Sequence, residues 1–251
     1  MDRMAWIKVG TCGFQKSRSA HYRYLDVLEV QQTFYDPPSP DRLEGWRREA
    51  PESFEFTVKA WMLITHEYNA RLWRRVKREL KGDPSNYGGF KPTREVMEAW
   101  EETLEAARAL DAKVIVFQTP RSFQPTTPNI RNLKNFITSV YEKDIVLAWE
   151  PRGAWWDHGE LLAQLSQDLE LLIVGDPLTG KNPYCSKSRC YYRLHGIGRG
   201  ETNYSYKYTD NDLARLYERL EEYSSYVNYV LFNNIHSFDD ALRFKTLTLT
   251  R

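Results

Sequence analysis

The sequence predicts a closed parallel (β/α)8 barrel formed by a single domain, residues 1–251. Short apolar runs rich in β-branched and aromatic residues alternate along the chain with segments of helical character. Each run stops at a polar residue or a turn, and most connections are long enough to hold a crossover helix. A length of 251 residues also fits one barrel of this kind.

Eight runs have the composition of buried strands. Continuous apolar runs are expected where both faces of a parallel sheet are covered. In chain order, the predicted strands are Trp6–Cys12, Val27–Tyr35, Phe54–Trp61, Lys113–Thr119, Ile145–Pro151, Leu171–Pro177, Cys190–Gly196 and Asn228–Asn234.

Helical periodicity fills most of the connections. A serine before Pro40 marks one helix start, and apolar residues form one stripe along Thr93–Leu110. We expect Leu178–Arg189 to be irregular and the glycine-rich Gly82–Pro92 to be a surface excursion rather than a mobile lid. The predicted helices are Pro40–Ala50, Thr93–Leu110, Asn129–Tyr141, Asp157–Leu169, Asp210–Tyr226 and a short closing helix, Ser237–Phe244.

Composition narrows the class of protein. The 35 basic and 34 acidic residues give a net charge of +1, so a nucleic-acid role would need a local basic patch. No apolar stretch reaches the roughly 20 residues of a membrane span, and the N-terminus has no signal-peptide layout. We expect a cytoplasmic protein that contacts no membrane and needs no obligate protein partner.

The three cysteines give no metal-site pattern. Cys12, Cys185 and Cys190 lack the paired short spacings of zinc or iron–sulfur sites. A disulfide between Cys185 and Cys190 is one alternative, and a reduced pair is the interpretation that we favour.

Polar residues gather where the predicted strands end. In a barrel of this type, the carboxyl ends of the strands form the functional rim. The residues expected at this rim are Cys12, Gln31, Thr33, Lys59, Gln118, Glu150, Arg152, Asp176, Arg193, His195, Asn233 and Asn234.

Alternation along the strands refines this rim, because every second side chain faces the barrel interior. Glu29 shares a face with Gln31, and Arg193 shares one with His195. A buried carboxylate is costly unless it is paired, so Lys59 and Arg193 are the predicted partners of Glu29. A structural ion-pair network that fixes strand register is the alternative to a functional role.

A glycine-rich loop, His195–Gly200, follows the seventh predicted strand. Its backbone N–H groups could approach an anion and Arg199 could clamp a phosphate, while an ordinary tight turn is the alternative. Nearby rings could stack on bases or sugars, or simply pack against the barrel. These aromatic residues are Trp155, Trp156, Tyr204, Tyr206 and Tyr208.

Short motifs extend from the first predicted strand to the last. They are Val9–Phe14, Glu29 with Thr33–Tyr35, Phe56–Lys59 with Thr65 and His66, Ala148–Arg152 with Trp155, Asp176-Pro177, Tyr191–Gly196, and Phe232–Asn234 with Ala241. Together they resemble the family called domain of unknown function seventy-two, or YecE-like. The resemblance implies a TIM-type barrel, no established activity, and a fold similar to the endonuclease IV and sugar isomerase barrels. Gln31 departs from the asparagine of the family pattern, and the segment Gly13–Tyr24 is short.

Acids and cations at one rim predict a hydrolase that acts on a phosphate-bearing nucleotide or nucleic acid. Glu150 is the predicted general base, His195 the general acid and Asp176 a second carboxylate. We favour a metal-free site; one divalent metal ion held by these three residues is the alternative. The cations that would neutralise phosphate charge are Lys59, Arg152 and Arg193. The predicted substrate-binding residues are Glu29, Gln31, His66, Arg152, Trp155, Tyr192, Arg193, Arg199, Asn233 and Asn234.

Three other functions stay open at this stage. The same carboxylates could serve a glycosidase or a sugar-phosphate enzyme. Lys59 could form an imine with a carbonyl substrate, as in an aldolase, although a neighbouring Glu29 would oppose the lowered pKa that this chemistry needs. The chain could also bind an oligonucleotide or a phosphorylated ligand without any chemistry.

Overall fold

Parallel strands form the centre of the computed structural model, which describes residues 6–198 and 200–250. The strands within these residues are β1 (Ile7–Cys12), β2 (Val27–Val30), β3 (Glu55–Lys59), β4 (Val114–Gln118), β5 (Val146–Glu150), β6 (Leu172–Ile173), β7 (Arg189–Leu194) and β8 (Val227–Phe232). Their order in the sheet is β6-β5-β4-β3-β2-β1-β8-β7, so the barrel is nearly closed. The predicted fold class is confirmed.

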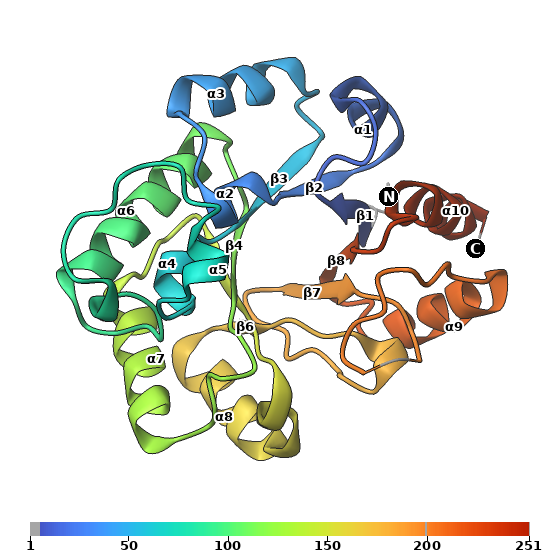
Figure 1. Cartoon of the computed structure of the whole chain (residues 1–251). Helices are drawn as coiled ribbons and strands as arrows, with labels where there is room; N and C mark the ends of the chain where they lie inside the picture. The colour runs from blue at the N-terminus through green and yellow to red at the C-terminus, as the bar shows by residue number, and fades with distance from the viewer. Residues whose placement is uncertain (1–5, 199, 251) are drawn as a thin grey trace.

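Helices form a ring around the strands (Figure 1). The α-helices are α1 (Arg18–Tyr24), α2 (Gln32–Tyr35), α3 (Pro40–Glu49), α4 (Met62–Thr65), α5 (Ala70–Trp73), α6 (Arg94–Ala109), α7 (Thr127–Ser139), α8 (Gly159–Leu169), α9 (Asp210–Glu221) and α10 (Ser237–Thr250). Short 3-10 turns are η1 (Pro84–Asn86), η2 (Gly153–Asp157) and η3 (Pro177–Thr179). Side-chain caps fix two of the helix starts, at Thr93 before α6 and at Thr209 before α9.

The two ends of the sheet meet at Gly175, just after β6. Its N–H donates to the carbonyl oxygen of Tyr191 over 3.0 Å, and its own carbonyl accepts from the Arg193 N–H over 3.0 Å. A Cβ atom at this position would lie 2.6 Å from the carbonyl oxygen of Lys181, so only glycine allows this close approach. The seam therefore sets the position of the next residue, Asp176, at the rim.

Strand alternation divides the buried residues into two layers. Outward-facing residues such as Leu28 and Phe117 pack against the helices, whereas inward-facing Val116, Ala148 and Leu231 belong to a smaller separate cluster. The inward-facing residues nearest the carboxyl ends of several strands are instead polar, and this polar layer contains the candidate site.

Two strands are shorter than the sequence predicted. β2 ends at Val30 and the chain turns into α2, so Gln31 and Thr33 leave the strand. The Thr33 hydroxyl lies 2.9 Å from the carbonyl oxygen of Val30 and 2.7 Å from that of Lys59, which stabilises the turn. β6 keeps only two residues, because the chain bends at the seam immediately after it.

Two predictions about the connections need correction. The closing helix α10 is not short, since its 14 residues continue to Thr250. The segment 82–92 is a surface excursion only in its first half, because Tyr87 and Phe90 are buried. The N–H groups of Gly88 and Phe90 donate to carbonyl oxygens of α4 and attach this second half to the core.

Cys185 and Cys190 form a disulfide, so the prediction of a reduced pair is wrong. A tight turn between Ser186 and Arg189 brings the two Cα atoms to 4.5 Å, within the range that a disulfide spans. Cys12 is free and buried.

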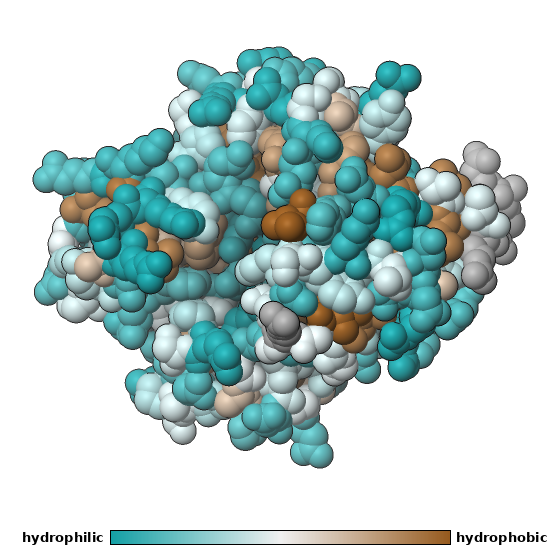
Figure 2. Space-filling model, turned by 45° about the vertical axis from the view of Figure 1, so that its right-hand side comes forward, coloured by the Kyte–Doolittle hydropathy of each residue, from teal (hydrophilic) through white to brown (hydrophobic). Residues whose placement is uncertain are grey.

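The visible surface offers few apolar areas. The face in Figure 2 is largely hydrophilic, and its apolar residues form small separate patches. Among the described residues, no helix combines the length and the apolar character that crossing a membrane requires.

Candidate functional site

Arg193 lies at the centre of the polar layer. Its Nη2 lies 2.9 Å from Oε1 of Glu29, while its Nη1 pairs with Oε2 of Glu150 and lies 3.2 Å from Oε1 of Gln118. Glu29 also accepts a hydrogen bond of 2.9 Å from the Tyr191 hydroxyl. Glu29, Glu150 and Arg193 are buried, so the predicted pairing of Glu29 with Arg193 is confirmed.

A second arginine joins this network to His195. Arg152 Nη2 pairs with Oε1 of Glu150 and lies 3.0 Å from Nε2 of His195. Burial raises the pKa of Glu150, but the charges of Arg152 and Arg193 outweigh it and hold this pKa well below its usual value. Burial also lowers the pKa of His195 well below its usual value, and the two arginines add to this effect against Glu150.

Asp176 forms no ion pair with any of the described residues. Its Oδ2 lies 3.4 Å from the backbone nitrogen of His195, and its Oδ1 is buried without a partner among the described residues. Burial raises the pKa of Asp176 to about 7, although the N–H groups of His195 and Leu178 and the charge of Lys181 act against it. Asp176 can therefore gain or lose a proton near neutral pH.

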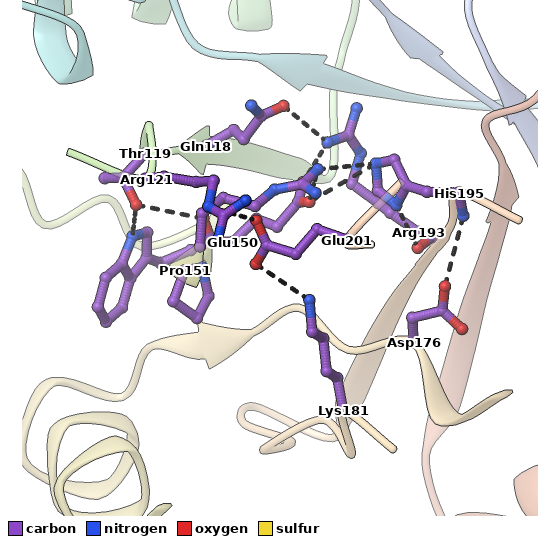
Figure 3. A network of polar contacts seen from close by, with 12 residues as sticks. Gln118, Thr119, Arg121, Glu150, Pro151, Asp176, Lys181, Arg193, His195 and Glu201 are labelled. Atoms are coloured by element: carbon purple, nitrogen blue, oxygen red, sulfur yellow. Dashed lines mark hydrogen bonds and ion pairs between the residues drawn. The ribbon is translucent and has the colours of Figure 1, made fainter. Parts of the chain in front are cut away.

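These side chains line a small pocket of about 20 Å³ at the carboxyl ends of β5 and β7 (Figure 3). Trp156 and Val174 contribute apolar wall to it. The polar lining residues are Glu150, Arg152, Asp176, Thr179, Lys181, Arg193, His195 and Glu201. A pocket of this volume has room for about one water-sized group, so a larger ligand would have to displace a lining side chain.

Lys59 ends β3 and does not line this pocket. Its Nζ lies 3.8 Å from the centroid of the Phe34 ring, and no carboxylate of the described residues lies within 4.0 Å of it. Burial and then the charge of Arg193 lower the pKa of Lys59 to about 7, against the opposing charges of Glu29 and Glu150. The expectation that Glu29 would keep this pKa high is wrong, because burial dominates.

His66 packs nearly perpendicular to the Phe34 ring, with ring centroids 5.2 Å apart. Its Nδ1 lies 2.8 Å from the Thr65 hydroxyl. Burial and then the charge of Lys59 lower the pKa of His66 to about 3, so the imidazole is neutral at physiological pH. His66 lines a separate surface groove together with Arg71 and Arg75.

Three predicted binding residues are structural. Tyr192 faces the outer layer, where its hydroxyl donates to Asn228. Trp155 is fully buried and stacks on Phe123. The amide of Asn234 donates to a carbonyl of the loop before α9 and to a carboxylate in the first turn of α10. Their side chains make these packing contacts and do not line the pocket.

Gln31 and Asn233 lie at the rim without lining the pocket. The Gln31 amide donates to Glu29 and so supports the buried network from above. Asn233 is half-buried, and its backbone N–H donates to the carbonyl oxygen of Leu194 over 2.8 Å. Arg199 lies outside the described residues.

The glycine-rich loop forms hydrogen bonds with the segment that follows it in the chain. The N–H of Gly196 donates to the Tyr208 hydroxyl over 2.7 Å, and the carbonyl oxygen of His195 accepts from Asn203 over 2.7 Å. This Gly196 amide therefore serves the turn rather than a phosphate. Tyr204 remains exposed, with its ring centroid 5.9 Å from that of His195.

The side chains do not fit the metal site considered from the sequence. Within residues 6–198 and 200–250, no three His, Cys, Asp or Glu side chains are grouped so that they could hold a metal ion. The oxygens of Glu150 pair with Arg152 and Arg193, and Nε2 of His195 faces Arg152. Two guanidinium groups beside these would-be ligands would repel a divalent cation.

The same contacts change the predicted catalytic roles. Glu150 is a weak base because its pKa is held so low, and His195 cannot supply a proton at neutral pH because its imidazole is already neutral. Asp176 differs from both, because its pKa of about 7 lets it exchange a proton near neutral pH.

Lys181 and Glu201 line the pocket but were missed in the sequence. Neither ends a predicted strand, since Lys181 lies in the irregular connection after β6 and Glu201 in the loop after β7. The position of Tyr191 could have been derived, because it lies two residues before Arg193 on the same face of β7.

Comparison with known proteins decides the family. The model of the family described as "Protein of unknown function DUF72" matches residues 13–250. The chain belongs to the DUF72 family. No curated protein matches the sequence. The resemblance seen in the sequence motifs is thus confirmed.

Solved structures of other DUF72 proteins have the same fold. The protein from Enterococcus faecalis V583 is 19% identical, with 98% of each chain covered and a TM-score of 0.72. The protein from Thermotoga maritima MSB8 is 22% identical, with 98% of this chain and 99% of that chain covered and a TM-score of 0.68.

Likeness outside the family is weaker. A D-tagatose 3-epimerase-like protein is 16% identical, with 97% of this chain and 96% of that chain covered and a TM-score of 0.56. It supports the barrel fold alone. Endonuclease IV from Thermus thermophilus is 12% identical over 96% of this chain and 97% of that chain, and its TM-score of 0.49 carries no argument.

Proposed function

We propose that this DUF72 protein hydrolyses a phosphate ester in a nucleotide or at the end of a nucleic acid, with Asp176 as the acid–base group. The observation that supports this most directly is the buried Oδ1 of Asp176, which has no hydrogen-bond partner among the described residues and lies in a pocket that also presents Arg152 and Lys181. A buried carboxyl oxygen without a protein partner is a candidate to bond a ligand or a water.

The proposed reaction needs one proton carrier. The Asp176 carboxylate accepts a proton from a water molecule, whose oxygen attacks phosphorus. The phosphorus–oxygen bond to the leaving alcohol then breaks, and Asp176 returns the proton to that oxygen. Its pKa of about 7 suits both steps. Arg152 and Lys181 would neutralise the charge that develops on the phosphoryl oxygens.

An exposed basic segment supports a nucleic-acid substrate. Residues 71–81 contain six basic residues and one acid, all of them exposed, while Leu72, Trp73, Val76 and Leu80 are half-buried between them. Of the six, Arg78 is paired with Asp36 and Glu102. The others provide the local patch that the neutral overall composition lacks. Arg71 and Arg75 also line a groove of about 460 Å³.

The test is hydrolysis of p-nitrophenyl phosphate, bis(p-nitrophenyl) phosphate, mononucleotides and a single-stranded oligonucleotide. We expect Asp176→Asn to lower turnover by at least about a hundredfold, the usual scale for an acid–base residue. Asp144→Asn is the matched control, because Asp144 is exposed and far from the pocket in the fold. A wild-type protein that hydrolyses none of these compounds would overturn the enzymatic proposal. Phosphate binding without turnover would then favour a binding module.

Lys59 supports a second candidate function, imine chemistry on a carbonyl compound. An amine with a pKa near 7 is substantially neutral at physiological pH and can attack a carbonyl carbon, releasing water as the imine forms. Borohydride would reduce such an imine to a stable amine on Lys59, which mass spectrometry detects. A panel of aldehydes and ketones that leaves no adduct on Lys59 would eliminate this function.

A further inference from the structure

Glu201 crosses from the loop after β7 to the opposite side of the candidate pocket (Figure 3). Its Oε1 accepts from the backbone N–H of Gly153 over 2.7 Å and from Nζ of Lys181 over 3.2 Å. Its Oε2 lies 3.6 Å from Nε of Arg121. The carboxylate thus lies between three donors that come from three different loops.

These donors form a complete anion-binding arrangement. Gly153 supplies a backbone N–H, Lys181 an ammonium and Arg121 a guanidinium that is 75% exposed. The charge of Arg152 also acts on the Glu201 carboxylate. Burial raises the pKa of Glu201, but the Gly153 N–H and the cations outweigh it and lower this pKa, so the carboxylate is ionised at neutral pH.

The position of Glu201 connects two cavities. It lines the pocket that contains Asp176, and it also lines an open depression of about 490 Å³ with Arg121, Gly153 and Lys181. A ligand that enters from this depression meets the Glu201 carboxylate before it reaches Asp176. When the Glu201 carboxylate moves aside, the cations around it lose their shared ion-pair partner.

We propose that the Glu201 carboxylate occupies a binding site for an anionic group of the ligand, and that a phosphoryl group displaces it. A phosphoryl group presents three acceptor oxygens and up to two charges, so it can satisfy Gly153, Lys181 and Arg121 together better than one carboxylate does. This inference rests on the proposed phosphate-bearing substrate and names the residues that would hold its phosphoryl group.

The alternative is that Glu201 is a structural ion pair that fixes the loop after β7. In that case, substitution of Glu201 would destabilise the loop and would not increase the affinity for anions. The two alternatives therefore predict opposite effects of the same substitution on anion binding.

Calorimetric titration with inorganic phosphate and with pyrophosphate tests the proposal. We expect Glu201→Ala to bind them about tenfold more tightly than the wild-type protein, because one charge-assisted competitor is removed. Adding Lys181→Ala to this variant should abolish the gain. Glu221→Ala is the matched control, since Glu221 is exposed at the end of α9 and lines neither of the two cavities. Unchanged or weaker phosphate binding by Glu201→Ala, with an unchanged melting temperature, would overturn the proposal.

A second arm distinguishes the ligand chemistry and the proposed function. Malonate in place of phosphate shows whether the site prefers a carboxylate, and a stronger gain for malonate would overturn the phosphoryl assignment. Tighter phosphate binding by Glu201→Ala without any hydrolysis would support the proposed anion-binding site and contradict the proposed hydrolase activity. If hydrolysis depends on Asp176 but phosphate binding does not change on substitution of Glu201, the proposed anion-binding site is contradicted and the proposed hydrolase activity is not. If Glu201→Ala fails to fold, Glu201→Gln provides the same test, because it keeps the shape of the side chain and removes its charge.

Discussion

The guanidinium of Arg152 donates a hydrogen bond to Nε2 of His195 over 3.0 Å. Arginine has no acceptor atom, so Nε2 must carry the lone pair, which assigns the histidine proton to Nδ1. Nδ1 lies 2.8 Å from the carbonyl oxygen of Arg193, which accepts that proton. Burial keeps the imidazole neutral, and the contact with Arg152 adds to this effect and fixes the tautomer.

We expect His195 to stay neutral from pH 5 to pH 8. Nitrogen-15 NMR, with the signal assigned by a His195→Asn variant, should show a protonated Nδ1 and a bare Nε2 throughout. In Arg152→Met the pKa of His195 should rise, because a charge that lowers it is gone while Oε1 of Glu150 remains 3.6 Å away. A wild-type His195 that titrates near pH 6.5 would contradict this assignment.

Arg193→Met should destabilise the fold by about 3–5 kcal/mol, the usual cost of removing one partner from a buried ion pair. It leaves the carboxylates of Glu29 and Glu150 buried without the guanidinium between them. Urea unfolding measures the change in the free energy of unfolding. Adding Glu29→Gln should recover part of the loss, since one uncompensated charge disappears.

The control for this substitution is Arg48→Met. Arg48 forms an exposed pair with Glu44, and exposed pairs contribute less than about 1 kcal/mol. A loss for Arg193→Met as small as that of the control would show that the buried network contributes nothing particular to stability.

Asp176 should make the protein less stable as the pH rises from about 4 to 7. Its pKa is about 7 in the folded protein, whereas an unfolded aspartate has a pKa of about 3.9. Between these values the folded state binds the proton more tightly, and this contribution is lost as the carboxyl ionises. Each pH unit between the two pKa values is worth about 1.4 kcal/mol, so the loss is at most about 4 kcal/mol.

Asp176→Asn should remove this dependence, so the variant should exceed the wild-type protein in stability at pH 8 and match it near pH 4. Denaturant unfolding across this pH range measures the difference, and Asp144→Asn serves as the exposed control. If the asparagine variant gains nothing at pH 8, the carboxyl of Asp176 has an ordinary pKa and the proposed acid–base role loses its basis.

The barrel could be predicted because strand composition is a local property of the sequence. The pairing of Glu29 with Arg193 could also be predicted, because a buried carboxylate inside a strand requires a cation and few cations face inward. The early end of β2 could not be seen, because the hydroxyl of Thr33 lies within hydrogen-bond distance of the carbonyl oxygen of Lys59, 26 residues away. Such a contact exists only once β2 and β3 are adjacent.

Catalytic roles were the least predictable part of the site. Residue type alone favours Glu150 as a base and His195 as an acid, yet both protonation states depend on where Arg152 lies. Glu201 was missed because it lies in a loop, and loop positions follow from tertiary packing rather than from strand periodicity. Predicting the protonation state of a rim residue therefore requires the distances between side chains on different strands.

The disulfide between Cys185 and Cys190 should contribute about 2 kcal/mol to stability, the value expected for a loop of about five residues. Cys185 lies in the connection that also holds Asp176 and Lys181, and Cys190 lies in β7. Reduction should therefore lower the melting temperature and loosen the segment before β7. Thermal unfolding with and without dithiothreitol measures the first effect, and hydrogen exchange of residues 181–189 measures the second.

A double variant, Cys185→Ser with Cys190→Ser, separates the disulfide from the reductant. It should melt at the temperature of the reduced wild-type protein and should not respond to dithiothreitol. The buried thiol of Cys12 is unchanged in this variant, so any remaining response would come from that residue. If the oxidised wild-type protein and the double variant melt together, the turn between Ser186 and Arg189 is stable by itself and the covalent bond adds nothing to the barrel.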